Sequence, residues 1–189
     1  MNCQIKRQLD YITSRKHRSF RRELTKAELD NILPSIYDKN LSYMQRNTLR
    51  LKLFLEHETP VILPDTKIHG LRTIVDFPDI YAPGEMDDIK KTHFVHEKGK
   101  VTNLSWDVLT VLSEGLEGRR KRLENGNKQD PEFVRCANET IDFTEKFADR
   151  YAQALSDSGN PLHGEMISRV IRYGAVTMLE ALQLFRLLH

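Results

Sequence analysis

The longest helical pattern in the sequence runs from Asp130 to Ser156, and it restricts the fold more than any other feature. Asp130 suits an N-cap and Pro131 suits the first helical position, where a backbone N–H has no partner in any case. Apolar residues then recur at helical spacing: Ile141, Phe143, Phe147, Tyr151 and Leu155. A long helix with one apolar face needs other elements to cover it, so the sequence predicts a helical assembly.

Two capping boxes predict further helix starts, Thr25–Glu28 and Thr177–Glu180. Pro34 is expected to limit the first of these helices. In the second we expect a buried apolar stripe made of Leu179, Leu182, Phe185 and Leu188. Other helices are expected over residues 1–22, 42–57 and 160–172, with a short one inside 85–96. The many apolar residues of 42–57 suggest that this helix is buried between two layers.

Residues 103–125 predict another amphipathic helix. Asn103 and Ser105 are candidate N-caps, and Gly126 is expected to end the helix in a left-handed conformation. The expected apolar stripe consists of Val108, Leu109, Leu112 and Leu116.

Residues 59–75 have a different character, because they are rich in β-branched side chains and interrupted by Pro60 and Pro64. They predict two extended segments joined by a turn at Pro64-Asp65. The whole sequence therefore predicts a mainly α-helical fold with a short extended pair near residues 60–75. It shows no internal repeat or domain boundary, so residues 1–189 are expected to form one region.

Composition limits the classes of partner. The net charge is only +2, so no global field favours nucleic acid. The basic residues between Lys6 and Arg22 favour a solvated helix face, and contact of Arg15–Arg22 with nucleic-acid phosphates is the weaker alternative. No apolar run approaches the ~20 residues needed to cross a bilayer, and no membrane partner is expected. Cys3 and Cys136 are isolated, which excludes a disulfide framework and fits a reducing cytoplasm.

Clusters of titratable residues do not form a convincing catalytic or metal site. His93 and His96 are spaced to share a helix face, but a zinc ion needs further ligands that the sequence does not supply. Residues 56–58 coincide with a helix end, where histidine is common. The carboxylate pairs Asp87-Asp88 and Glu114/Glu117 have no adjacent nucleophile, which favours a solvated face. We predict no catalytic residue and no metal ligand.

Four segments, in order, resemble the N-terminal region of glycyl radical enzymes of the pyruvate formate-lyase type. They are Glu58–Ile62 with Ile68–Gly70, the V-L-x-x-L-x-x-G-L-E-G pattern at Val108–Gly118, Phe133–Leu155, and Thr177–His189. Glu180–Gln183 followed by Phe185 is the most specific part. The resemblance covers most of residues 45–189. It implies helices that wrap a catalytic barrel and shape one wall of the substrate channel.

The family carries a backbone glycyl radical, which a separate iron–sulfur activase installs with S-adenosylmethionine. The radical passes to a cysteine, whose thiyl form abstracts hydrogen from the substrate. Members are lyases, dehydratases, decarboxylases or formate acetyltransferases. The resemblance places both essential loops downstream of His189, so the chain would be a fragment that is inactive alone. Its implied partners are the rest of the barrel and the activase, and a homodimer is a further candidate.

In some members, the loop before the Val108-type helix reaches the substrate with Gly-His and an acidic residue four positions later. This sequence has Gly99-Lys100 and Leu104 there, so the substrate preference is not carried over. The candidates for a substrate pocket are His93, His96, Lys100 and Asn103.

The alternative hypothesis is a stand-alone helical binding or scaffold module without catalysis. In that case, the last helix would be covered by the protein's own core or by a symmetric partner.

Overall fold

The computed structural model describes residues 3–13, 21–38, 40–64, 66–76, 81–82, 84–91, 107–126 and 130–188. The helices are α1 Cys3–Thr13, α2 Lys26–Ile36, α3 Tyr43–His57, α4 Glu85–Lys91, α5 Val108–Glu124, α6 Pro131–Asp157, α7 Pro161–Tyr173 and α8 Met178–Leu188. The strands are β1 Arg21–Glu23, β2 Pro60–Val61, β3 Leu71–Arg72 and β4 Ile74–Asp76. The mainly helical class and the extended pair near 60–75 are confirmed.

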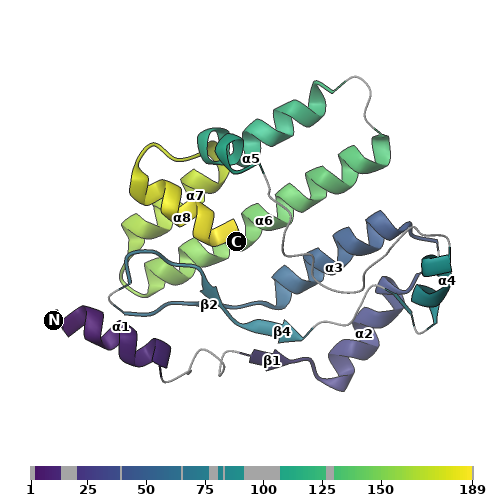
Figure 1. Ribbon diagram of the computed structural model, residues 1–189, viewed down its shortest axis with the longest axis horizontal. Helices are drawn as coiled ribbons and strands as arrows, with labels where there is room; N and C mark the ends of the chain where they lie inside the picture. Colours follow the sequence, from purple (N-terminus) through teal and green to yellow (C-terminus); the bar gives the residue numbers. More distant parts are fainter. Residues whose placement is uncertain are drawn as a thin grey trace.

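Helix α6 is the element against which α3, α5 and α7 all pack, with α3 and α5 on different sides of it (Figure 1). It begins as predicted, because the Asp130 carboxylate accepts the backbone N–H of Glu132 at 2.9 Å and Pro131 occupies the first turn. Its expected stripe faces the core, with Phe143 only half-buried. The fully buried centre of that core includes Tyr151, Leu155, Ile167, Ile171 and Leu184.

Helix α7 returns along α6 after the short loop at residues 158–160. The two backbones approach closely at Gly164, where a Cβ would lie 2.6 Å from the carbonyl oxygen of Ala152. Gly174 caps the end of α7 with φ of 82°.

Helix α8 turns a different face to the core from the one the sequence predicted. Gln183, Leu184 and Leu187 are buried, and Leu188 packs partly against the core. The other members of the expected stripe, Leu179, Leu182 and Phe185, remain 39–41% exposed. The reason is polar: the side-chain amide of Gln183 pairs with the backbone of His69, which fixes the rotation of the helix.

Helix α5 is kinked at Gly115, whose φ of 65° and ψ of −164° are not helical. The N-cap is Asp107, while the predicted caps Asn103 and Ser105 lie outside the described residues. The predicted left-handed end at Gly126 is wrong, since Asn125 caps the helix in a right-handed conformation. The kink lets the end of α7 run against α5, where Ala175 donates its N–H to the carbonyl of Leu112 at 2.7 Å.

The first part of the chain departs most from prediction. Helix α1 ends at Thr13, and residues 21–22 belong to strand β1 rather than to a helix. Strand β1 pairs in parallel with β4, with Arg21 opposite Ile74 and Glu23 opposite Asp76. Pairing with a strand about fifty residues away overrides the local helical pattern.

Helix α2 begins with the predicted capping box and continues past Pro34 to Ile36. Helix α3 begins at a second capping box made by Ser42 and Gln45. It is not enclosed between two layers: Leu55 is buried, but Met44 and Leu51 are 40% and 36% exposed. Its surplus of apolar residues therefore stays partly in solvent.

Two side chains of α6 join the first part of the chain to the core. The Arg150 guanidinium donates to the carbonyl of Leu55 and, at 3.2 Å each, to those of Glu56 in the last turn of α3 and Glu58 just after it. The Tyr151 hydroxyl lies 2.9 Å from the carbonyl oxygen of Leu71 and 3.2 Å from that of Val61. These contacts tie α3 and the β2–β3 pair, where Val61 is opposite Leu71, to one side of α6.

Candidate functional site

All four predicted pocket residues, His93, His96, Lys100 and Asn103, lie outside the described residues. Their place in a substrate pocket therefore stays a prediction. Both cysteines are described. Cys3 is exposed at the start of α1, and Cys136 is buried on the inner side of α6.

The other clusters singled out in the sequence are structural. His57 is the last residue of α3, and its Nδ1 lies 2.7 Å from the carbonyl oxygen of Leu53 in the preceding turn. Glu58 is almost fully buried and pairs with Arg72 at 3.0 Å. Asp87 and Asp88 are exposed, and Asp88 pairs with Lys91. Of the basic residues near the N-terminus, Arg22 is engaged by Glu28 and by the carbonyl of His57.

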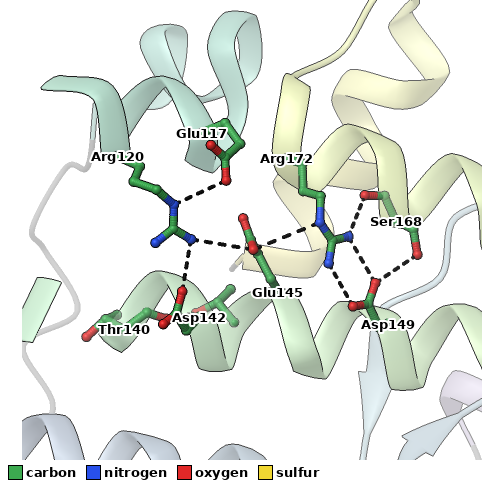
Figure 2. A network of polar contacts seen from close by, with 9 residues as sticks. Glu117, Arg120, Thr140, Asp142, Glu145, Asp149, Ser168 and Arg172 are labelled. Carbon is green, nitrogen blue, oxygen red and sulfur yellow. Dashed lines mark hydrogen bonds and ion pairs between the residues drawn. The ribbon is translucent and has the colours of Figure 1, made fainter. Parts of the chain in front are cut away.

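An extended polar cluster joins three helices, and we call it the ion network (Figure 2). Its members are Glu117 and Arg120 of α5, Asp142, Glu145 and Asp149 of α6, and Ser168 and Arg172 of α7. The three carboxylates of α6 are three and four residues apart. Asp142 pairs with Arg120 of α5, Asp149 pairs with Arg172 of α7, and Glu145 lies between them. The network therefore stabilises the packing of α5 and α7 on α6.

Arg120 and Arg172 each have one close carboxylate partner on α6. Arg120 donates to Asp142 at 3.0 Å and to Glu117 at 3.1 Å. Arg172 and Asp149 form two parallel bonds of 2.7 and 2.9 Å, and Ser168 adds a third bond to Asp149 at 3.1 Å. The hydrogen bonds from Arg172 lower the pKa of Asp149, so this carboxylate is ionised.

Glu145 lies between the two arginines but is not closely paired with either (Figure 2). Its Oε2 is 3.6 Å from Arg120 and 3.9 Å from Arg172, and its buried Oε1 has no hydrogen-bond partner in the described part of the chain. Burial raises the pKa of Glu145, and this effect outweighs the lowering of the pKa by the positive charges of Arg172 and Arg120. A carboxylate in this position is a poor ion-pair partner and gains from being neutral.

A second polar contact connects the β2–β3 region to α8. The Gln183 amide accepts the His69 N–H at 2.8 Å and donates to the His69 carbonyl at 2.7 Å. His69 is 4% exposed, and its imidazole meets the His163 ring edge-on, with the two centroids 5.5 Å apart. Burial and then the charge of His163 lower the pKa of His69, so the ring is held neutral.

The ion network and the Gln183–His69 contact stabilise the packing of the helices and do not form a recognisable catalytic arrangement. Among the described residues, no three His, Cys, Asp or Glu side chains come close enough together to hold a metal ion. The described residues line open surface grooves, among them one of about 660 Å³ beside the kink of α5 and Tyr173 and one of about 500 Å³ between α3 and α6. Sequence reasoning missed the ion network, although the spacing of Asp142, Glu145 and Asp149 on one side of the α6 stripe could have indicated it.

Comparison with known proteins gives no relative. No protein-family model, no curated protein sequence and no solved structure matches this chain. In the part of the chain that the structure describes, no helix is both long and apolar enough to cross a bilayer.

Proposed function

We propose that the chain is the N-terminal helical part of a pyruvate formate-lyase-like glycyl radical enzyme. In this proposal its helices wrap the catalytic barrel and shape one wall of the substrate channel. The chain itself contributes no radical-carrying residue, and the cysteine, the glycine and the activase belong to the complete system. The sequence resemblance, carried by four segments in order, is the basis of the proposal.

One structural observation supports it, namely the second apolar face of α8. The inner face of this helix packs on the core through Leu184 and Leu187. Its outer face (Met178, Leu179, Leu182 and Phe185) stays 39–74% exposed. This helix resembles the one that leads into the barrel in the family. Covering the outer face with the rest of the barrel would remove about 25 cal/mol of unfavourable hydration free energy per Å² of apolar surface.

The test is to isolate the endogenous polypeptide anaerobically, with an antibody raised against α6, and to determine its mass and sequence. The proposal predicts a polypeptide several-fold heavier than 22.1 kDa, with cysteine and glycine loops downstream of residue 189. After activation it should show an organic-radical doublet in electron paramagnetic resonance. A polypeptide without these two loops would refute the proposal.

A second candidate function is a stand-alone helical binding or scaffold module. The observation that favours it is that the chain's own core already covers the inner face of α8, with Gln183 and Leu184 fully buried. This candidate predicts that the outer face of α8 binds a partner. Leu182→Asp should then abolish binding of that partner. Leu162→Asp, which changes a 77% exposed leucine of α7, should leave the binding intact. Equal effects of the two changes would refute a role for α8.

A further inference from the structure

Helices α3 and α6 lie side by side and are joined at both ends. Near their N-termini, the Ser42 hydroxyl bonds Glu132. Near the other end, Arg150 of α6 bonds the carbonyl of Leu55. The two helices therefore run in the same direction, and the 500 Å³ groove lies between these two contacts. We call it the α3–α6 groove.

The floor of the α3–α6 groove is apolar. Leu41 and Leu49 contribute from α3 and the residues before it, and Phe143 contributes from α6. All three are only half-buried, although Phe143 also packs on the main core. The floor thus offers apolar surface that nothing in the described part of the chain covers completely.

The rim of the groove carries positive charge that is not neutralised within the protein. Lys52, Arg135 and Lys146 line it and are exposed, and none of the three has an ion pair or a hydrogen-bonded side-chain partner among the described residues. Asp142 also lines the groove, but it is already paired with Arg120 at 3.0 Å. Glu139 is the one remaining carboxylate of the lining, so cations predominate.

The positions of the cations define the shape of a ligand. Arg135 and Lys146 are eleven residues apart on α6, which corresponds to about 16 Å along the helix axis, or three helical turns. Because α3 runs parallel to α6, Lys52 lies toward the Lys146 end. Arg135 therefore stands at one end of the apolar floor, and Lys52 and Lys146 stand at the other. The distance between the two ends corresponds to a short helix.

From this arrangement we propose that the α3–α6 groove binds an amphipathic α-helix of a partner protein. Its apolar face covers Leu41, Leu49 and Phe143, and carboxylates on its flanks pair with Lys52, Arg135 and Lys146. Helices that bind in grooves use apolar anchors at i, i+3 or i+4, and i+7, which span about two turns and fit between cations about three turns apart. A nucleic acid fits less well, since a phosphate backbone has no apolar face to cover Leu41, Leu49 and Phe143. The inference does not depend on the proposed radical enzyme.

The experiment uses the full chain and a phage-displayed library of helical peptides about four turns long. Each peptide carries leucine at i, i+4 and i+7, and its flanking positions vary among Glu, Lys and Ser. We expect peptides with Glu flanks to be enriched. Their affinity, measured by fluorescence anisotropy, should fall about tenfold or more in the variant K52E/R135E/K146E and should decrease with salt. All three changes are at exposed positions, so circular dichroism should remain that of the wild type.

The matched control is Lys121→Glu, which reverses an exposed cation in the other groove and should leave the affinity unchanged. The proposal is overturned if no peptide is enriched, if Lys flanks are selected, or if binding survives the triple reversal. Duplex DNA and phosphatidylserine vesicles are assayed in parallel. If they bind through the three cations while the acidic peptides do not, the groove is a general polyanion site and the proposal is also overturned.

Discussion

Gly115 of α5 and Gly174 at the end of α7 meet backbone to backbone, and a Cβ on Gly115 would lie 2.6 Å from the backbone nitrogen of Gly174. Both residues have positive φ, 65° and 82°. A Cβ on Gly174 would in turn lie 2.6 Å from the carbonyl of Ser113. The kink in α5 and the end of α7 therefore depend on each other.

Alanine at either glycine should be severely destabilising, because a backbone clash adds to the strain of a left-handed residue. We expect Gly115→Ala and Gly174→Ala to lower the free energy of unfolding by about 3 kcal/mol or more in urea titrations. Gly159→Ala is the control, since Gly159 also has positive φ (88°) but open space around it. It should cost only about 1–2 kcal/mol. Equal losses at the three positions would show that the close contact contributes nothing.

The Gln183–His69 pair should contribute as much to the free energy of unfolding as an apolar contact in the core does. Gln183→Leu keeps the volume but leaves the buried N–H and carbonyl of His69 without partners, which should cost about 2–4 kcal/mol. The His69 amide should also exchange its hydrogen faster. Gln153→Leu serves as the control, because Gln153 is exposed and its amide bonds the exposed Asp157, and it should change stability by about 0.5 kcal/mol or less. A loss no larger than that in Gln183→Leu would contradict the assigned role.

Stability should fall in mildly acidic solution because of His69. Its folded-state pKa is lower than the usual 6.5, so the unfolded state takes up the proton first. The stability contribution of the neutral ring is complete above pH 6.5 and is lost as the pH falls from there through the folded-state pKa. Urea titrations at pH 7.5 and 5.5 should show a larger decrease for the wild type than for His69→Phe. Parallel pH dependence of the two proteins would exclude His69 as the cause.

The two acidic residues of α6 that face Arg172 should respond in opposite ways to neutral replacement. The pKa of Glu145 is raised above 4.5, so its ionised form opposes folding increasingly as the pH rises from 4.5 through the folded-state pKa. At pH 7, Glu145→Gln should therefore leave the free energy of unfolding unchanged or increase it. Asp149→Asn should decrease it by roughly 0.5–1 kcal/mol, a modest value because Asp149 is half exposed. Destabilisation of the same size in both variants would refute this distinction.

The helix starts could be predicted because their causes are local. Thr25, Asp130 and Thr177 cap helices through bonds to residues two or three positions along, which sequence spacing reveals. The rotation of α8 could not be predicted, because it depends on Gln183 meeting the backbone of His69, 114 residues earlier. Strand β1 was missed for the same reason, since its partner β4 is remote in sequence.

The candidate sites divide in the same way. The exposed carboxylates Asp87 and Asp88 were correctly interpreted as a solvated face. The same interpretation was wrong for Glu117, which is half-buried and pairs with Arg120. Arg120 and Arg172 were not recognised as partners of α6, because their pairing requires three helices to be assembled first. The first glycine of the V-L-x-x-L-x-x-G-L-E-G pattern is Gly115, whose positive φ produces the kink in α5. Hydrophobic periodicity alone does not predict this kink.

The three-residue connection between α6 and α7 has a consequence for the order of folding. Closing so short a loop costs little chain entropy, whereas pairing β1 with β4 requires about fifty residues to be closed into a loop before any bond forms. The α6–α7 hairpin is thus the part of the chain expected to nucleate folding. Residues 21–76 then add to it through Arg150 and Tyr151. A chain emerging from the ribosome would therefore hold its N-terminal third unassembled until α6 has been synthesised.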